Sequence, residues 1–219
     1  MCIRDRRRPA HDPVNLTKPE FVEPWVDDPV GPLCAAGTYT VELVRLLADG
    51  TAESLAGPES VDVVDVVTQA DSDDGTAFGA EIDDLRRRIA GAAKTITAAR
   101  DRLTHLRAAL AAAPGASPEL VGRLDACHRS VEGVATQLTG DPVLADLHEP
   151  PNQSVKGLAD RAGHFHLYRT GAPTQTQRAA VARAAAEFGP LGDALDAALT
   201  ELAELTEAVD DAGGTWTPR

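Results

Sequence analysis

Eleven apolar residues between positions 78 and 113 follow one another four and three positions apart without interruption. Because an α-helix has 3.6 residues per turn, this spacing keeps their side chains on one narrow stripe. It predicts a long amphipathic helix whose heptad seam is buried against partner helices. The seam consists of Phe78, Ile82, Leu85, Ile89, Ala92, Ile96, Ala99, Leu103, Leu106, Leu110 and Ala113.

Two later segments carry seams of the same kind. The turn at residues 114–116 separates the first two helices by only a few residues, which favours an antiparallel pair of helices. Ser117 is the expected N-cap of the second helix, and Pro118 and Glu119 suit its first turn. The second seam consists of Leu120, Leu124, Cys127, Val131, Val134 and Leu138, and the last of Val181, Ala184, Phe188, Leu191, Leu195, Ala198, Leu202, Leu205 and Val209.

Capping and breaking residues predict where the other helices begin and end. The Gly-Asp-Pro run at residues 140–142 is expected to stop the second helix, and a shorter helix is expected from about residue 154 to 168. The last helix begins at Thr174, where Gln177 completes a capping box. Pro190 lies inside this helix and is expected to kink it, because proline lacks the backbone donor.

These helices define the predicted fold class. Aromatic residues make up only 4% of the chain, although 43% of it is hydrophobic, so the core consists of Ala, Leu and Val side chains. Such a core suits closely packed helices. We predict a mainly α protein in which residues 71–219 form an elongated antiparallel helical bundle with heptad seams. A parallel homodimeric coiled coil is the alternative arrangement for the same seams.

A small β segment is predicted before the bundle, at residues 34–70. Tyr39 and Val41 alternate with polar residues after Gly37, which is the period of a half-buried strand. The Gly-Pro pair at residues 57–58 is expected to break the chain before a β-branched run, so two or three strands are predicted.

The order Gly37-x-Tyr39-x-Val41 resembles the entry to a late strand of an immunoglobulin-like sandwich. Such a sandwich has about seven strands, and this chain has too few. Residues 34–70 are therefore predicted to be a partial immunoglobulin-like β-sandwich.

The N-terminal residues 1–33 are rich in proline and have no apolar period. They are predicted to be extended or disordered. Within them, the residues 1–6, Met-Cys-Ile-Arg-Asp-Arg, look like translated sequencing-adapter read-through. We therefore expect that the chain is a fragment of a longer protein and that these six residues have no part in the fold.

One group of side chains has the chemistry of metal ligands. His164 and His166 lie near Asp160 in the sequence, and His148 and Glu149 precede them. Residues two apart on a helix point about 200° away from each other, so the two later histidines cannot hold one ion. The sequence predicts no metal site here.

The acidic run at residues 71–75 resembles the start of a calcium-binding loop. An EF-hand loop beginning at Asp71 needs Gly at its sixth and Glu at its twelfth position, where this chain has Thr76 and Ile82. The run is instead expected to be a solvated linker that caps the first long helix.

The remaining motifs point away from catalysis. The three cysteines, Cys2, Cys34 and Cys127, show no metal-ligand or disulfide spacing, and Cys127 is expected to be a buried free thiol in the second seam. The sequence has no glycine-rich phosphate loop, no G-x-S-x-G and no H-E-x-x-H motif. We predict no catalytic, cofactor-binding or metal-binding residue and expect that this chain is not itself an enzyme.

Charge and hydropathy limit the expected partners. The formal net charge is -13, so nucleic acid is not expected as a partner. No apolar run approaches the roughly 20 residues that span a bilayer, and membrane insertion is not expected. No export signal is visible in the sequence as given.

Several short motifs follow one another in a characteristic order along the chain. They are Gly31-Pro32-Leu33, Gly37-Thr38-Tyr39-Thr40-Val41, Val63-Val64-Asp65-Val66, the long heptad helix, Pro114-Gly115-Ala116, Gly140-Asp141-Pro142, Glu149-Pro150-Pro151 and Trp216-Thr217-Pro218. This order resembles the C-terminal region of bacterial sortilin-like β-propeller proteins, which are described as BNR-repeat or Asp-box glycosyl-hydrolase-like proteins. The resemblance extends from about Gly31 to Arg219.

In that family the propeller lies upstream of an immunoglobulin-like strand region and a helical tail. No Asp-box repeat occurs in this chain, so no hydrolase residue can be transferred to it. The resemblance implies a non-catalytic C-terminal accessory module that associates with the upstream propeller or another protein, in an extracytoplasmic parent. Two alternatives are part of a secreted glycosyl hydrolase that borders its substrate site, and a free-standing helical protein-interaction domain.

Overall fold

The computed structural model describes residue 34 and the ranges 36–64, 72–147, 153–167 and 172–214. They belong to two compact units. One comprises the described residues up to Glu81 and those within His166–Pro173, and the other comprises the described residues within Ile82–Phe165 and from Thr174 onward. The boundary falls inside the first long helix, which is continuous across it.

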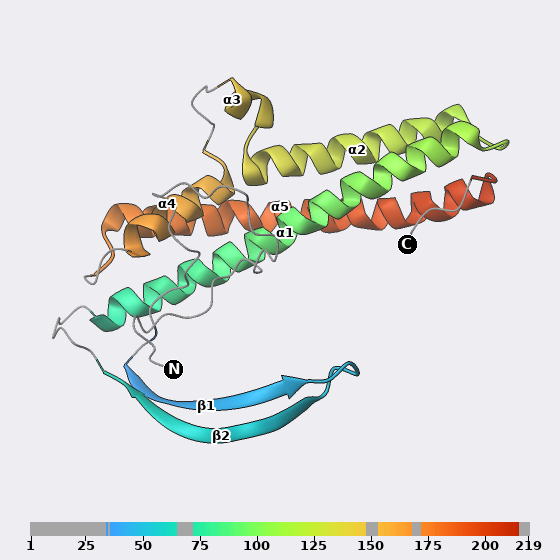
Figure 1. Cartoon of the computed structure of the whole chain (residues 1–219). Helices are drawn as coiled ribbons and strands as arrows, with labels where there is room; N and C mark the ends of the chain where they lie inside the picture. Colours follow the sequence, from blue (N-terminus) through green and yellow to red (C-terminus); the bar gives the residue numbers. More distant parts are fainter. Residues whose placement is uncertain (1–33, 35, 65–71, 148–152, 168–171, 215–219) are drawn as a thin grey trace. The chain divides into compact units, whose positions relative to one another are not determined.

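The described residues are mainly helical, with one small sheet before the helices, as the sequence predicts (Figure 1). The elements are β1 (Gly37–Leu46), β2 (Ala52–Val63), α1 (Ser72–Ala112), α2 (Pro118–Thr139), α3 (Pro142–Asp146), α4 (Val155–Leu167) and α5 (Gln175–Asp211). The residues 1–33, for which an extended or disordered segment is predicted, lie outside the described ranges. None of the described helices is both long and apolar enough to cross a membrane.

β1 and β2 form a two-stranded antiparallel hairpin. The Gly57-Pro58 pair, expected to end a strand, instead lies inside β2, where the register shifts near Val41 and Leu43 accommodate it as an irregularity. Gly57 has φ +97°, and a Cβ there would lie 2.7 Å from the carbonyl oxygen of Val41, so only glycine fits. The β-branched run from Val61 is the end of β2 and not a third strand within the described range.

α1 begins at Ser72, earlier than predicted, so most of the acidic run expected to be a linker belongs to the first helical turn. Acidic side chains there still complement the helix dipole. The predicted seam is buried along the whole of α1 and into Ala113, except that Ala92 is half-buried. The heptad spacing therefore identifies the buried stripe of this helix correctly.

The predicted caps are also present. The Ser117 hydroxyl accepts a hydrogen bond from the backbone N–H of Leu120 at 3.2 Å, and α2 ends at Thr139 before Gly140. Thr174 and Gln177 form the capping box of α5. The seams of α2 and α5 are buried, with only Leu191 half-buried.

Ion pairs and hydrogen bonds establish how the helices of the second unit pack. α2 lies antiparallel to α1, since Arg100 pairs with Glu132 and Arg107 with Asp125. α2 also contacts α5, where Arg123 bonds to Glu201.

α4 lies against the same two helices as α2. Arg86 of α1 pairs with Asp160 of α4 at 3.0 Å, and Gln153, just before α4, accepts a hydrogen bond from Arg183 of α5. α2 and α4 therefore follow one another along α1 and α5 (Figure 1). The bundle has three helical positions, and α2 and α4 share the third.

α3 follows α2 in the sequence and lies outside the bundle (Figure 1). The sequence did not predict this short helix, which has no buried residue, and Val143 is exposed. At the opposite end of α2 the chain turns tightly. The backbone N–H of Gly115 donates to the carbonyl of Ala212 at 2.9 Å, and a Cβ at Gly115 would meet that same oxygen.

Candidate interaction surface

At the end away from its turn, the hairpin presents one mainly apolar and one polar side. Tyr39 pairs with Val61 and Gly37 with Val63 across the two strands, and Val41 follows on the same side because strand side chains alternate. We call Tyr39, Val41, Val61 and Val63 the apolar face of the hairpin, which also carries Glu59, the cross-strand partner of Val41. Val41 is 46% exposed and Val61 37% exposed.

Near Thr38 and Thr40 the opposite side of the hairpin is polar, whereas in the half next to the turn the adjacent Leu43 and Val44 expose apolar side chains on both sides. The Thr38 hydroxyl donates a hydrogen bond to Asp62 at 2.7 Å, and Thr40 pairs with Ser60. The alternation of an apolar with a polar side is typical of a sheet that packs one side on a core and turns the other to water. In the described structure, however, Val41 and Val61 of the apolar face remain exposed.

The turn and the distal half of the hairpin carry the remaining polar contacts. Arg45 of β1 pairs with Glu53 of β2. In the turn, the Thr51 hydroxyl and, secondarily, the Thr51 backbone N–H donate to the carboxylate of Asp49 and lower its pKa. Leu46 at the end of β1 is 75% exposed.

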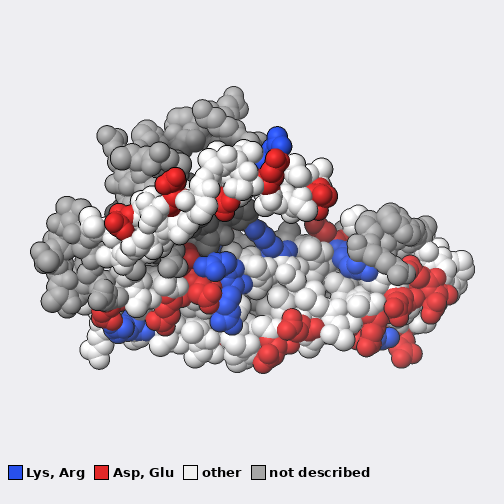
Figure 2. All heavy atoms as spheres, turned by 90° about the horizontal axis from the view of Figure 1, so that it is seen from below, with Lys and Arg blue, Asp and Glu red and all other residues white. Residues whose placement is uncertain are grey.

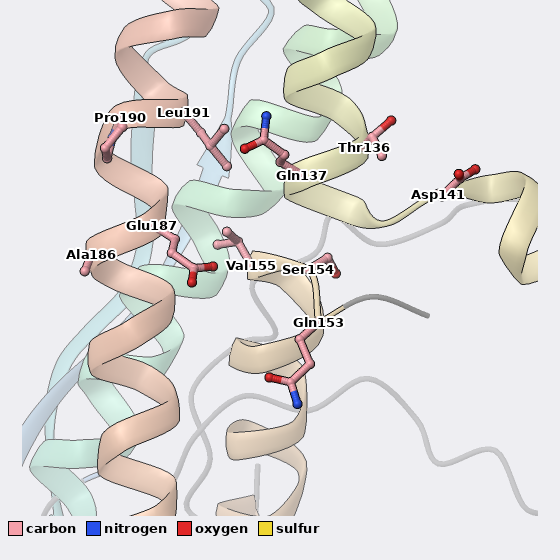
Figure 3. A pocket seen from close by; sticks show the side chains of 10 residues that line it. All are labelled: Thr136, Gln137, Asp141, Gln153, Ser154, Val155, Ala186, Glu187, Pro190 and Leu191. Carbon is pink, nitrogen blue, oxygen red and sulfur yellow. The ribbon is translucent and has the colours of Figure 1, made fainter. Parts of the chain in front are cut away.

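A hollow of about 460 Å³ lies where α2 ends and α4 begins, against α5 (Figure 3). Its apolar wall comes from Val155 of α4 and from Pro190 and Leu191 of α5. The other lining residues are Thr136, Gln137, Asp141, Gln153, Ser154, Ala186 and Glu187.

The hollow lies at the interruption of the α5 seam, where Leu191 lines it. The antiparallel register set by Arg100 and Glu132 brings the end of α2 level with Ala93 of α1. Ala92 and Leu191 are the two seam residues that are only half-buried. Their exposure follows from the packing, because neither α2 nor α4 covers the core at this level.

The polar groups that line the hollow are used by nearby helix ends and ion pairs. Asp141 accepts a hydrogen bond from the backbone N–H of Val143 at 2.9 Å, and the Ser154 hydroxyl accepts one from Gly157 at 3.1 Å. Glu187 pairs with Arg183. These contacts stabilise α3, α4 and α5 locally, so they account for the polar lining without a bound group.

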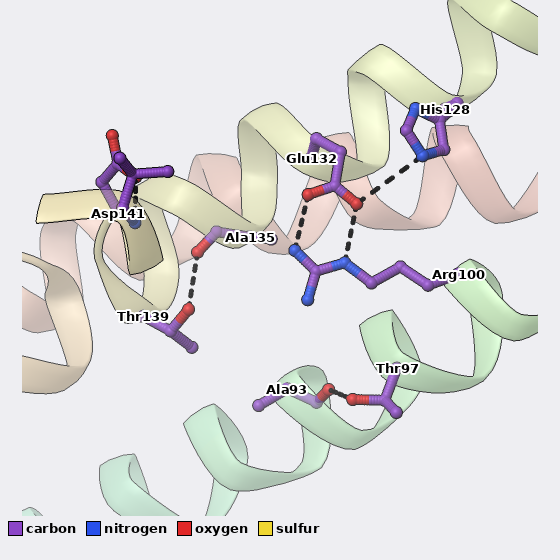
Figure 4. Close-up of polar contacts among 9 residues, drawn as sticks. Ala93, Thr97, Arg100, His128, Glu132, Ala135, Thr139 and Asp141 are labelled. Atoms are coloured by element: carbon purple, nitrogen blue, oxygen red, sulfur yellow. Dashed lines mark hydrogen bonds and ion pairs between the residues drawn. The ribbon is translucent and has the colours of Figure 1, made fainter. Parts of the chain in front are cut away.

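The ion pairs between helices are half-exposed. Arg100 donates two hydrogen bonds to the Glu132 carboxylate, at 2.7 and 2.6 Å, and His128 lies 3.9 Å from it (Figure 4). The guanidinium of Arg100 lowers the pKa of Glu132, and the carboxylate raises that of Arg100. Over the face drawn in Figure 2, acidic side chains are scattered with basic ones among them.

The histidines singled out in the sequence have separate surroundings. His148 and Glu149 lie outside the described residues. His166 makes a 2.7 Å hydrogen bond with the carbonyl of Gly75 and packs edge-to-face on Phe78, with 5.2 Å between the ring centroids.

Asp160 and the exposed His164 also have their own contacts. Asp160 accepts hydrogen bonds from Arg86 and Lys156. Within the described ranges, no three His, Cys, Asp or Glu side chains gather as metal ligands would. Asp73 and Asp74 of the acidic run are part of α1, and Asp71 lies outside the described residues.

Cys127 is buried in the α2 seam, as the sequence predicts. Its thiol donates to the carbonyl oxygen of Ala198 in α5 at 3.5 Å, and burial raises its pKa. A thiol with a raised pKa is a poor nucleophile, so this position serves packing. Cys34 is half-buried, and Cys2 lies outside the described residues.

The sequence patterns missed a polar contact between α1 and α5. Arg102 lies one position off the stripe of α1, yet its guanidinium donates two hydrogen bonds to the hydroxyl of Thr206 in α5, at 3.0 and 2.9 Å. Thr206 is itself buried. The long side chain of an arginine one position from a seam can extend past the seam to the neighbouring helix. This position is the one weak sequence signal for the contact.

Comparison of the chain with family models, with curated proteins and with solved structures gives no significant match. The resemblance to sortilin-like β-propeller proteins stays a prediction.

Proposed function

We propose that this chain is a non-catalytic accessory and interaction module, the C-terminal part of a sortilin-like β-propeller protein. In this proposal the apolar face of the hairpin docks on the upstream propeller. The observation that carries the proposal is the exposure of that face, where Val41 is 46% exposed and Val61 37%.

The distribution of exposed apolar side chains supports this choice of surface. Most of the large apolar side chains that are exposed among the described residues lie in or next to the hairpin. They are Val41, Leu43, Val44, Leu46, Leu47, Leu55, Val61 and Val64, whereas the helices and the turns between them expose Val121, Val143 and Leu147. Because an exposed apolar cluster is a marker of an interaction site, the hairpin is the best candidate.

The hairpin also has a physical need for a partner. A two-stranded sheet is marginally stable in water by itself, and its strands here are long, at 10 and 12 residues. Burying apolar surface contributes about 25 cal/mol per Å². A second β-layer that packs face to face on these residues would cover them at the usual spacing of about 10 Å. A β-structured partner therefore suits this face better than a small molecule.

The test requires the natural sequence upstream of this chain. If that sequence encodes a propeller, the propeller is produced separately and its binding to this chain is measured by calorimetry. We expect that Val41→Asp and Val61→Asp abolish binding. The matched variants Thr40→Asp and Ser60→Asp, on the polar side of the same strands, should bind as the natural chain does.

Two results would reject the proposal. One is an upstream sequence without propeller repeats, which favours a free-standing interaction domain. The other is propeller binding that the apolar-face variants do not weaken, which places the contact elsewhere. Circular dichroism on each variant checks that the helical bundle is retained, since the substitutions lie outside its seams.

A further inference from the structure

A second hollow, of about 330 Å³, lies between α4 and α5. Leu158 and Ala162 of α4 contribute to its apolar lining, and both are buried. Ala180 of α5 lines it as well. We call this hollow the α4–α5 groove. Its volume is at the lower end of the range for small-molecule sites, and an apolar lining with a few polar groups is their usual composition.

The charged residues that line the groove are both basic. Arg161 of α4 and Arg183 of α5 line it, and none of the described carboxylates does. This is unusual in a chain with a net charge of -13. Arg183 bonds to Glu187 and Gln153, whereas Arg161 has no hydrogen-bond or ion-pair partner among the described residues. The groove therefore favours an anionic occupant.

The first turn of α5 adds a donor that lacks an acceptor. Gln177 also lines the groove and is only 7% exposed. Its side-chain oxygen accepts hydrogen bonds from the backbone N–H and the hydroxyl of Thr174, but its amide nitrogen has no acceptor among the described residues. A buried donor without an acceptor costs free energy, which an anionic oxygen can recover. The N-terminal end of a helix also attracts negative charge.

The packing brings these groups to one end of the groove. Gln153 bonds to Arg183, and α4 runs antiparallel to α5, so residues further along α4 lie level with earlier residues of α5. Arg161 is thus level with the first turn of α5, where Gln177 lies. The apolar residues Leu158 and Ala180 lie toward the other end.

We propose that the α4–α5 groove binds a small amphipathic carboxylate. The carboxylate pairs with Arg161 beside the first turn of α5, and the apolar body lies on Leu158, Ala162 and Ala180. Inorganic anions fit less well, because the lining is mostly apolar and would remove their water without replacing it. This site is distinct from the hairpin surface, so the two proposals succeed or fail separately.

The probe is octanoate, titrated into the full chain in a calorimeter. We expect saturable binding of one octanoate per chain. Acetate, which has the head group alone, and 1-octanol, which has the tail alone, should each bind more weakly. Arg161→Gln should weaken octanoate binding by about fivefold, the effect of losing an exposed charge pair. Ala180→Phe should abolish binding because it fills the groove.

Matched variants on α2 serve as controls. Arg129→Gln removes an exposed arginine, and Ala126→Phe adds a ring at an exposed alanine. Both should bind octanoate as the natural chain does. The proposal is overturned by the absence of saturable binding, by 1-octanol binding as tightly as octanoate, or by equal losses in the groove variants and the α2 controls.

Discussion

The guanidinium of Arg100 in α1 holds the carboxylate of Glu132 in α2 through two hydrogen bonds, at 2.7 and 2.6 Å (Figure 4). Bidentate geometry of this kind adds directional specificity to an ion pair. Both side chains are more than one third exposed, so solvent screens their attraction. The pair therefore contributes mainly to the antiparallel register of α1 and α2 and little to the free energy of unfolding.

This pair predicts a pH dependence of stability. Because the hydrogen bonds from Arg100 lower the pKa of Glu132, the folded protein binds this proton less readily than the unfolded chain does. The contribution of the ionised Glu132 to the free energy of unfolding is present above the ordinary glutamate pKa. It is lost as the pH falls through the lowered pKa of the folded protein. Urea unfolding at pH 7 should show Glu132→Gln to be destabilised by at most about 1 kcal/mol.

The difference in free energy of unfolding between Glu132→Gln and the natural chain should be smaller when urea unfolding is measured at pH 3. Glu207→Gln, at an exposed carboxylate of α5 outside the ion pairs found among the described residues, should show little difference at either pH. A destabilisation by Glu132→Gln that is the same at both values would contradict the assigned pKa shift.

The buried seam predicts a sharp contrast between adjacent positions of α1. Leu103 is 2% exposed and Thr104 is exposed. Leu103→Ala should lower the free energy of unfolding by about 2–5 kcal/mol, and Leu103→Asp should unfold the bundle because it buries an unpaired charge. Thr104→Asp introduces the same charge on the outside and should change stability by about 0.5 kcal/mol or less. Chemical denaturation measures all three, and equal effects at the two positions would mean that the seam is misplaced.

The contact between Arg102 and Thr206 predicts that replacing Arg102 lowers the free energy of unfolding, although the heptad pattern places this arginine outside the seam. Arg102→Ala leaves the buried hydroxyl of Thr206 without its donors, although that hydroxyl still donates to Leu202. We expect a loss of about 1 kcal/mol in the free energy of unfolding. The double variant Arg102→Ala, Thr206→Val closes a mutant cycle, and strictly additive effects would show that the two side chains do not interact.

Burial of Cys127 predicts slow thiol chemistry. In a variant with Cys2→Ser and Cys34→Ser, the remaining thiol should react with Ellman's reagent only at the rate at which α2 separates from α5. The raised pKa adds to this protection, because only the thiolate reacts. Full reactivity is expected in 6 M guanidinium. A burst of reaction in the folded protein would refute the buried position.

The complete seams predict that residues 71–219 fold without the preceding part of the chain. Circular dichroism of that fragment should show a mainly helical protein, and sedimentation should show a monomer, because each seam is covered by helices of the same chain. A stable dimer would instead support the parallel coiled coil considered from the sequence alone.

The stripe of each helix and its caps were determined by the sequence itself. Whether Leu103 faces inward and whether Ser117 or Thr174 begins a helix depends on side chains within a few positions, and the repeat of 3.6 residues converts that spacing directly into a face. The same local logic explains why Cys127 was correctly placed in a seam. It also explains an error, since an irregularity in the strand pairing let β2 continue through Gly57-Pro58, which local propensity marked as a break.

Only the tertiary structure decided which faces remain open. α2 and α4 share one position of the bundle, and a hollow lies between the end of α2 and the start of α4. Ala92 and Leu191 are therefore half-buried, although the heptad pattern does not distinguish them from the other seam residues. The hydrogen bonds from Arg102 likewise join it to Thr206, which is far away in the sequence, and the packing of α4 on α5 places Arg161 and Gln177 in the lining of one groove. The helical repeat of 3.6 residues determines the direction in which a side chain leaves its own helix. The residues that this side chain contacts depend on where the neighbouring helix ends.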